Sequence, residues 1–306
     1  MSESRVVVSV CMITYNHEEF ISKAIEGVMM QQTSFPIELI IGEDCSTDST
    51  HAICLKYKSK YPDKIKLRIQ EFNLGMTQNF ISTLQVSTGK YIAQCEGDDY
   101  WTDPYKLQKQ VDFLEANEAY SVCFHRCRHF DVEKEILTED ACGYLFKDNT
   151  IDGVAVTTEM FLFKWITQTL TMVYRRDAFN LEFALKYKYF RDMHLIYHLL
   201  QVGKGYLFAF DGGVYNVTGN GIFSKMSIEQ ECISTVKIYR ELLLKNKDEL
   251  LLFHYLKSLQ WAIDQLSVIK YSKVKLYNFA FIHFRYSKEF YSFLKNIFKI
   301  TFSYKK

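Results

Sequence analysis

Four short apolar segments, each followed by a polar turn, constrain the fold of this 306-residue chain more than any other feature. They lie at residues 5–14, 38–42, 64–70 and 91–95 and are rich in Val and Ile, which is typical of strands buried on both faces. Between them, apolar residues recur at helical spacing, as at 20, 21, 24, 25, 28 and 29. We expect this helix to begin near residues 16–17, and another helix to span residues 79–87. Strands that alternate with helices predict an α/β fold with a mostly parallel, Rossmann-like sheet and flanking helices.

The pattern becomes helical from Ser227 onward, so we expect a first domain over residues 1–225 and a helical, basic and aromatic region over 226–306. Residues 270–306 hold nine Lys or Arg and one acid, a charge of +8, which leaves −7 for the rest of the chain. A stripe at 290, 293, 294, 297 and 298 is apolar, and lysines lie opposite it on a helix. Two interpretations remain open: a helical layer that packs on the first domain, or an anchor on an anionic membrane surface.

Composition excludes several classes of protein. Lys and Arg together number 37 and Asp and Glu 36, a balance that argues against a nucleic-acid-binding protein. The eight cysteines are scattered without a CxxC pair, and the N-terminus shows no signal-peptide pattern. No window has the roughly 18 unbroken apolar residues of a membrane span. We therefore expect a reduced cytoplasmic protein that can lie peripherally at the inner face of the membrane.

Polar residues follow the predicted strands at the edge where α/β sheets bind ligands. They are residues 14–16, 43–44 and 96–99. No GxGxxG or GxxxxGK[ST] motif occurs, which argues against dinucleotide binding and P-loop chemistry. Asp98 and Asp99 are adjacent carboxylates that repel each other unless a cation joins them, and Mg²⁺ or Mn²⁺ with a diphosphate is a suitable partner. A solvated acidic turn is the alternative interpretation.

The ordered motifs resemble those of the family 2 inverting glycosyltransferases. They are the segments at residues 8–16 (VSVCMITYN), 40–50 (IIGEDCSTDST), 73–75 (NLG), 89–91 (GKY) and 96–99 (EGDD). The resemblance implies the GT-A nucleotide-diphosphosugar fold, with a donor-binding half at about 5–115 and an acceptor half at about 116–225.

Roles for individual residues follow from this resemblance. It implies that Tyr15 lies beside the nucleotide base, that Asp44 accepts a hydrogen bond from the base, and that Asp98 contacts the ribose or donor sugar. It also implies that Asp99, with Asp98, holds Mn²⁺ or Mg²⁺. The substrate-binding residues are then Thr14, Tyr15, Asn16, Asp44, Asn73, Gly75 and Asp98.

The second half of the first domain matches the family more loosely. Asp192 lies where relatives have the general base, and Arg191 replaces the acid that commonly precedes it. We expect Arg191 to lower the pKa of Asp192 and so to weaken it as a base. Asn216 and Thr218 replace the Arg and His of a family segment that holds diphosphate. The Gln-x-x-Arg-Trp motif of processive synthases is absent, which favours addition of a single sugar.

Cys123, His125, Cys127 and His129 alternate along a predicted strand and so share one face. Along an extended chain they span roughly 20 Å, too far to close around one zinc ion. Burial in the core is the favoured interpretation of this pattern.

The sequence thus predicts an enzyme that transfers one sugar, with inversion, from a nucleoside-diphosphate sugar (a uridine donor) to a hydroxyl of a glycan or lipid-linked acceptor. The expected process is the synthesis of cell-surface polysaccharide. A sugar-phosphate nucleotidyltransferase is one alternative, but the turn at residues 14–17 lacks the glycines and Arg that would hold a triphosphate. A non-catalytic carbohydrate- or partner-binding module is the other, and the substitutions at 191, 216 and 218 favour it.

Overall fold

The computed structural model describes residues 6–146, 151–164, 166–219 and 226–268. Contacts divide the chain into two compact units, residues 1–225 and 226–306.

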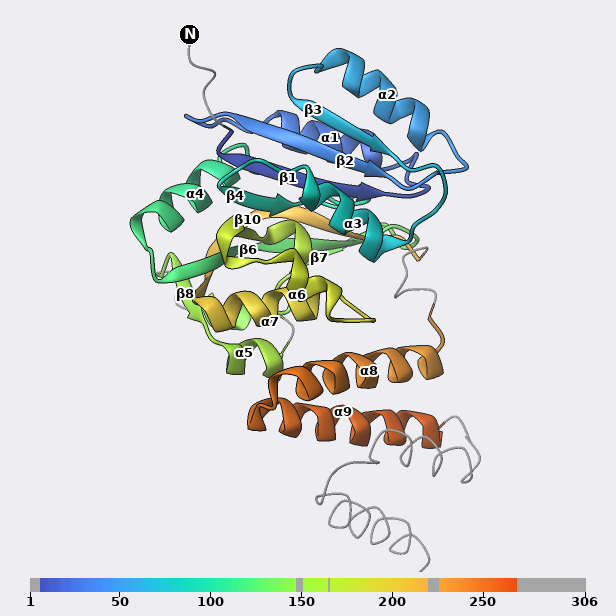
Figure 1. The fold of residues 1–306 in the computed structure, drawn as a ribbon, viewed down its shortest axis with the longest axis vertical. Coiled ribbons are helices and arrows are strands. Elements are labelled where there is room, and N and C mark those ends of the chain that lie inside the picture. The colour runs from blue at the N-terminus through green and yellow to red at the C-terminus, as the bar shows by residue number, and fades with distance from the viewer. Residues whose placement is uncertain (1–5, 147–150, 165, 220–225, 269–306) are drawn as a thin grey trace, which may run out of the picture. The chain divides into compact units, whose positions relative to one another are not determined.

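A long sheet forms the centre of the first unit (Figure 1). The four predicted strands are present as β1 (Val8–Thr14), β2 (Ile37–Glu43), β3 (Ile65–Ile69) and β4 (Tyr91–Gln94). β1 pairs in parallel with β2 on one side and β4 on the other, and β3 extends the parallel block beyond β2. All four strands therefore end at the same edge of the sheet.

The sheet continues past β4 in the order β3-β2-β1-β4-β9-β6-β10-β5. β9 (Val173–Arg175) is antiparallel to both of its neighbours, so β6 (Tyr120–Asp131) and β10 (Lys204–Val217) run in the same direction as β1. Three shorter antiparallel strands complete it: β5 (Tyr100–Trp101), β7 (Ile136–Thr138) and β8 (Gly153–Val156). The predicted fold class, a mostly parallel sheet with flanking helices, is confirmed.

Helices cover both faces of this sheet (Figure 1). Alternate residues of β1, such as Val8 and Val10, point to one face and form a core with three helices. These are α1 (Ile21–Met29), α2 (Thr50–Lys60) and α4 (Lys106–Ala116). α3 (Met76–Gln85) covers the opposite face, where Asn79 Nδ2 donates to Gly42 O at 2.8 Å. A Cβ at Gly42 would lie 2.5 Å from Asn79 Oδ1, so this close packing requires glycine.

Shorter elements build the rest of the first unit. α7 (Asp192–Val202) packs beside β10 and β6, and α5 (Thr158–Phe163) packs against α7. The remaining elements are α6 (Leu181–Leu185) and the 3₁₀ turns η1 (Gly143–Phe146), η2 (Thr169–Thr171) and η3 (Arg176–Ala178).

The described residues of the second unit, 226–268, are helical, as the sequence pattern predicted. α8 (Ile228–Asn246) begins with a capping box in which Ser227 Oγ accepts from Gln230 N and Gln230 Oε1 accepts from Ser227 N. α8 and α9 (Glu249–Val268) lie side by side, and α8 contributes Cys232 and Val236 to a small core shared with α9. The described helices are all too short or too polar to cross a membrane. The predicted apolar stripe at 290–298 lies outside the described residues.

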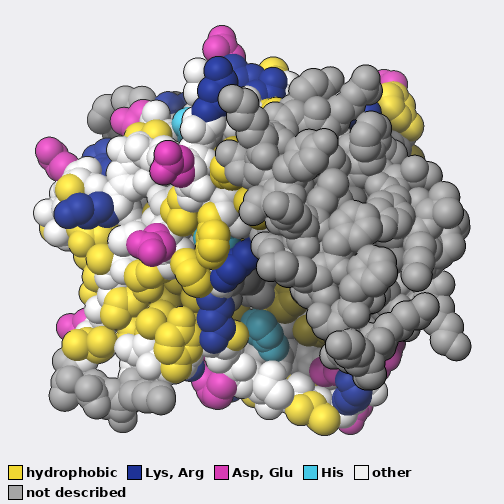
Figure 2. Space-filling view, turned by 90° about the horizontal axis from the view of Figure 1, so that it is seen from below, with side chains coloured by type: hydrophobic (Ala, Val, Ile, Leu, Met, Phe, Trp, Pro, Cys, Tyr) yellow, Lys and Arg dark blue, Asp and Glu magenta, His cyan; other side chains and the backbone are white. Residues whose placement is uncertain are grey.

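Apolar side chains are also exposed at the surface. Figure 2 shows hydrophobic side chains gathered on one face of the molecule beside several Lys and Arg side chains. In the second unit, the exposed ones include Ile228, Leu244 and Phe253.

Two helices begin at other residues than the pattern predicted. α1 begins at Ile21 and not near residue 17, because Asn16 adopts a left-handed conformation (φ 55°) and a turn separates it from the helix. α3 begins at Met76, three residues earlier than predicted, directly after Gly75, whose φ of 79° favours glycine.

Three of the four alternating thiols and imidazoles of β6 are buried, and His129 is partly buried. Cys123, His125 and Cys127 are buried, and burial raises the pKa of the Cys123 thiol to about 12. His125 Nδ1 lies 2.7 Å from the carbonyl oxygen of Arg126. These are the packed core positions that the alternation favoured.

Lys106, in the first turn of α4, is fully buried. Its ammonium nitrogen lies 3.6 Å from the centroid of the Trp101 ring and has no hydrogen-bond partner among the described residues. Burial lowers the pKa of Lys106 to about 7, whereas an unfolded lysine has a pKa of about 10.4. Between these pH values the unfolded chain binds more protons at this site than the folded chain does, so the free energy of unfolding rises with pH.

We predict that Lys106→Met abolishes this dependence. The wild type should gain stability relative to the variant between pH 7 and 9 by roughly 1 kcal/mol per pH unit, measured by urea unfolding. Lys56→Met, at an exposed lysine of α2, is the control and should follow the wild type at both pH values. A constant difference between wild type and Lys106→Met would contradict the prediction.

Candidate active site

One large pocket lies at the edge of the sheet where the parallel strands end. It has a volume of about 480 Å³. Thr14 closes β1, Asp44 follows β2, the turn at residues 96–99 follows β4, and Tyr215 lies near the end of β10. The predicted site residues that line it are Thr14, Tyr15, Asp44, Asn73, Gly75, Asp98, Asp99 and Asp192.

At one end of the pocket, Asp44 holds the turn that precedes α3. Its Oδ1 accepts from Leu74 N at 2.8 Å and its Oδ2 from Gly75 N at 2.9 Å. Tyr15, which lines the same pocket, follows Thr14, whose carbonyl oxygen accepts from Asp44 N at 3.1 Å, and it is 41% exposed. An accessible aromatic ring next to a fixed carboxylate can bind a flat, polar ring.

Asn16 is not among the residues that line the pocket. Its side-chain oxygen accepts from Thr47 N at 2.8 Å, and its own N–H donates to Ser46 Oγ at 3.0 Å. These bonds join the loop after β1 to the loop after β2. Asn16 thus shapes the rim of the pocket from outside it.

The acidic turn after β4 is held in place by backbone hydrogen bonds. Gly97 N donates to Ile13 O at 2.9 Å, and a Cβ at Gly97 would lie 2.6 Å from Thr14 Oγ1. Asp99, only 2% exposed, accepts the N–H of Asn216 at 2.9 Å, and Asn216 Nδ2 donates to Asp98 O. Asn216, which replaces a basic residue of the family pattern, here fixes the acidic turn.

Two further groups approach this turn and were not predicted from the sequence as site residues. His17 Nε2 lies 3.7 Å from Asp98 Oδ2. Glu96 lines the pocket, and its Oε2 has no hydrogen-bond partner among the described residues.

The electrostatics of the turn favour a bound cation. Burial, opposed by a hydrogen bond from Thr169 and reinforced by Asp98, raises the pKa of Glu96 to about 7. Burial and the neighbouring Asp98 and Glu96 carboxylates raise the pKa of Asp99 well above its usual range. A positive charge at this point would stabilise the ionised forms of these groups.

The described side chains form no complete metal cage, since no group of three or more His, Cys, Asp or Glu converges. Mg²⁺ and Mn²⁺ suit sites with one or two carboxylates that are completed by substrate phosphates. Asp98 and Asp99 offer oxygen donors of this kind, and the Glu96 oxygen that has no hydrogen-bond partner among the described residues is a further acceptor beside them. The residues present therefore fit a divalent ion that binds together with a diphosphate.

Asp192 opens α7 and lines the same pocket. Burial raises its pKa, although the Met193 N–H and the Arg191 charge oppose the shift. We expected the neighbouring Arg191 to lower this pKa. The Arg191 charge does act in that direction, but burial has the larger effect, so the pKa is raised and not lowered.

Sequence reasoning missed several other residues of the pocket wall. Thr77 and Phe80 come from α3, which begins three residues earlier than predicted, and Tyr215 directly precedes Asn216, a departure from the family pattern. The other unpredicted lining residues include Gln94, Gln168 and Thr169.

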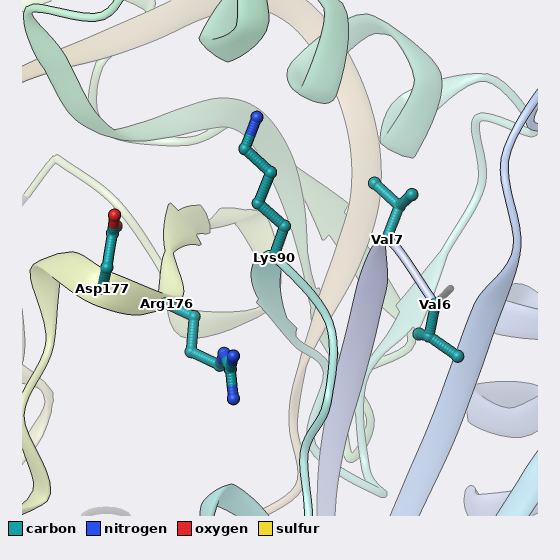
Figure 3. Close-up of a pocket in the computed structure, with 5 residues that line it drawn as sticks. All are labelled: Val6, Val7, Lys90, Arg176 and Asp177. Atoms are coloured by element: carbon teal, nitrogen blue, oxygen red, sulfur yellow. The ribbon is translucent and has the colours of Figure 1, made fainter. Parts of the chain in front are cut away.

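A second cavity, of about 280 Å³, lies at the opposite edge of the sheet. Lys90 and Arg176 line it, but Figure 3 shows their side chains pointing in different directions. Lys90 is paired with Glu115 at 2.7 Å, and Arg176 Nη1 donates to Ser87 O. This cavity gathers no chemistry comparable with that of the large pocket.

Comparisons with known proteins agree with this geometry. An uncharacterized protein of Mycobacterium tuberculosis is 38% identical over 173 residues, 55% of this chain and 47% of that protein. The UDP-Glc:alpha-D-GlcNAc-diphosphoundecaprenol beta-1,3-glucosyltransferase WfaP of Escherichia coli is 32% identical over 114 residues, 37% of this chain and 43% of that protein. The chain thus spans about half the length of the curated relatives that it matches.

Solved structures share the fold. That of S. aureus TarS 1–349 in complex with UDP-GlcNAc matches with a TM-score of 0.61 and 19% identity, covering 85% of this chain and 72% of that one. The mannosyltransferase PcManGT from Pyrobaculum calidifontis, in complex with GDP-Man and Mn²⁺, matches with a TM-score of 0.54 and 15% identity, over 95% of this chain and 83% of that one. The family model for glycosyl transferase family 2 matches residues 9–182, more than half of the sequence, so the chain belongs to glycosyltransferase family 2.

Proposed function

We propose that the chain transfers a single sugar from a nucleoside-diphosphate sugar, with uridine as the nucleoside, to a hydroxyl of a glycan or lipid-linked acceptor, with inversion at the anomeric carbon. The observation that carries the proposal is the convergence, in one pocket, of an exposed tyrosine (Tyr15) and a fixed carboxylate (Asp44), an acidic turn and a partly buried carboxylate (Asp192). The solved complexes of TarS with UDP-GlcNAc and of PcManGT with GDP-Man support a nucleotide-sugar donor.

The donor would lie across the ends of the parallel strands. The Tyr15 ring would face the base, and Asp44, already fixed by two backbone N–H groups, would accept from the base N–H. Asn73 and Gly75 would bound the base in the turn that Asp44 holds, Thr14 would line the floor, and Asp98 would contact the ribose or sugar. A site built on strand ends in this way holds the donor rigidly for transfer.

Asp99 and Asp98 would hold Mn²⁺ or Mg²⁺ together with the diphosphate. When bound, the ion supplies positive charge that stabilises the leaving diphosphate. The PcManGT complex with Mn²⁺ supports this assignment, as do the raised pKa values of Glu96 and Asp99.

Asp192 would act as the general base that removes the proton from the acceptor hydroxyl. A base must be ionised and still basic enough to accept a proton, and the raised pKa of Asp192 meets this need better than an ordinary aspartate. The hydroxyl would then attack the anomeric carbon from the face opposite the diphosphate, which gives inversion.

The acceptor side of the proposal rests on composition and on relatives. WfaP is named for transfer to a diphosphoundecaprenol-linked sugar, which supports a lipid-linked acceptor in cell-surface polysaccharide synthesis. Residues 270–306, with their charge of +8 and twelve aromatic residues, would place the enzyme at an anionic membrane face where such acceptors lie.

Asp99→Asn should weaken UDP binding in the presence of Mn²⁺ by roughly tenfold or more, about 1.4 kcal/mol. The amide keeps the oxygen that accepts from Asn216 N, so the fold should survive. Thermal-shift titration with UDP, with Mn²⁺ or EDTA, measures the effect because binding to the native state raises its stability. Asp112→Asn, at an exposed carboxylate of α4, is the control. Equal UDP affinity of the wild type in EDTA and in Mn²⁺ would refute the metal assignment.

Asp192→Asn should retain donor binding and lower turnover by roughly 10²–10⁴, because the acceptor loses its base. Turnover of the wild type should fall on acidification through a pKa above that of an ordinary aspartate, since protonation removes the base. The readout is release of nucleoside diphosphate from the donor that stabilises the chain best. Asp177→Asn, in the cavity at the opposite edge, should behave as wild type. Near-normal turnover of Asp192→Asn would show that another group is the base, and no turnover by the wild type with any donor would favour a non-catalytic module.

Truncation after Ser272 should abolish sedimentation with phosphatidylglycerol vesicles and leave UDP binding unchanged. Each basic residue near an anionic surface contributes about 1 kcal/mol, so the loss of most of the +8 charge removes the attraction. Phosphatidylcholine vesicles are the control for charge. A truncated chain that fails to fold, together with a full-length chain that ignores anionic vesicles, would instead assign residues 270–306 to the core.

A further inference from the structure

Arg191 is the only Lys or Arg among the described residues that line the large pocket, whereas five carboxylates line it. Those carboxylates are Asp44, Glu96, Asp98, Asp99 and Asp192. A lone guanidinium in such a wall would be expected to pair with one of them.

It does not. In the described part of the chain, no carboxylate oxygen lies within the 4 Å ion-pair distance of the Arg191 guanidinium, which pairs with neither Asp192 nor Glu96. Nη1 donates instead to two neutral oxygens, Thr77 Oγ1 at 3.2 Å and Phe190 O at 3.1 Å. Nε is buried and has no hydrogen-bond partner among the described residues.

This arrangement leaves a charged, planar donor group unsatisfied. A guanidinium has five N–H donors and remains protonated in proteins, and a buried donor without a partner destabilises the folded state. Its fork matches the two oxygens of a carboxylate or phosphate, which makes it suited to bind such an anion in two-point fashion.

The neighbouring backbone adds to the same preference. α3 begins after Gly75, which offers no side chain to cap it, and its first residues Met76 and Thr77 line the pocket beside the guanidinium. The start of a helix carries a partial positive charge that favours anions.

We propose that Arg191 binds an anionic group of a substrate, a phosphate or a carboxylate, at the corner of the pocket where α3 and α7 begin. This inference rests on the proposed function and assigns a ligand to a residue that the family resemblance marks only as a departure. The anion has two sources. One is the diphosphate of the donor, since Asn216 no longer supplies a positive charge there. The other is a carboxylate on the transferred sugar, as in a uronic acid.

A purely structural role for Arg191 predicts something different. The bond from Nη1 to Thr77 Oγ1 joins the start of α7 to the start of α3, and loss of that bond would disturb the whole pocket, including the end that would hold the base. Binding of uridine, which carries no phosphate, separates the two roles.

The experiment measures, by isothermal titration with Mn²⁺ present, the binding of uridine, UDP, UDP-glucose and UDP-glucuronate to the full chain. Arg191→Gln should weaken at least one anionic probe by roughly 10–100-fold, the usual size of a hydrogen-bonded charge contact, and change uridine binding less than twofold. Arg191→Lys, which keeps the charge without the fork, should recover part of the loss. The contact should also weaken at high salt.

Matched variants identify what each result means. Arg176→Gln makes the same charge change at the opposite edge of the sheet and should have no effect. Thr77→Val removes the bond to Nη1 and keeps the charge, so it should affect the anionic probes less than Arg191→Gln does. If Arg191→Gln loses the same affinity for UDP as for UDP-glucose, the anion is the diphosphate. If it loses affinity only for UDP-glucuronate, the anion is the carboxylate of the sugar.

Two outcomes overturn the inference. In the first, Arg191→Gln binds every anionic probe with the affinity of the wild type. In the second, Arg191→Gln loses as much affinity for uridine as for UDP. Failure of the wild type to bind any uridine compound would contradict the proposed function instead. Inorganic pyrophosphate and glucuronate then serve as the probes. If the wild type binds neither of them, or if Arg191→Gln changes the affinity for neither, the inference is overturned independently of the proposed function.

Discussion

The parallel pairing of β1 with β2 and β4 is the constraint on which the pocket depends. Thr14 pairs with Glu43 at the last step of the β1–β2 register, and Cys95 N donates to Cys11 O just beyond β4. These pairings bring the three turns after β1, β2 and β4 to one edge of the sheet. Because a shift of one residue would turn every side chain to the other face, the buried core on both faces keeps the register and with it the site.

The acidic turn adds an electrostatic constraint to this frame. Asp98 and Asp99 lie beside Glu96 in a partly buried setting, where burial and the Asp98 charge raise the pKa of both Glu96 and Asp99. The fold offsets part of this repulsion with neutral donors, such as Asn216 N to Asp99 Oδ1, and with His17 near Asp98. A cation bound with a diphosphate, as proposed above, would offset the remaining repulsion.

The sequence predicted the sheet and most of one end of the pocket because those features are local. Continuous apolar runs mark the strands, and Asp44 and Asp98 lie within a few residues of strand ends. The rest depends on contacts between distant segments. Nothing near Asn16 in sequence shows that it would bind Thr47, and the burial that outweighs Arg191 at Asp192 comes from segments far along the chain. From the sequence, Asn216 was notable only because it replaces a basic residue of the family pattern. Its hydrogen bond to Asp99, 117 residues away in the sequence, gives it a role in holding the acidic turn.

Hydrogen bonds of a side chain join the two halves of the pocket, whereas strand pairing builds the donor half. Thr77 Oγ1 donates to Phe190 O at 3.1 Å and accepts from Arg191, so the start of α3 fixes the start of α7. Asp192 follows directly and opens α7, which also packs on β10 and β6, so this link joins the carboxylate proposed as the base to the donor half. An anion bound by Arg191 would therefore contact the same segment that carries Asp192, so donor binding and the position of the proposed base would be linked through these two residues.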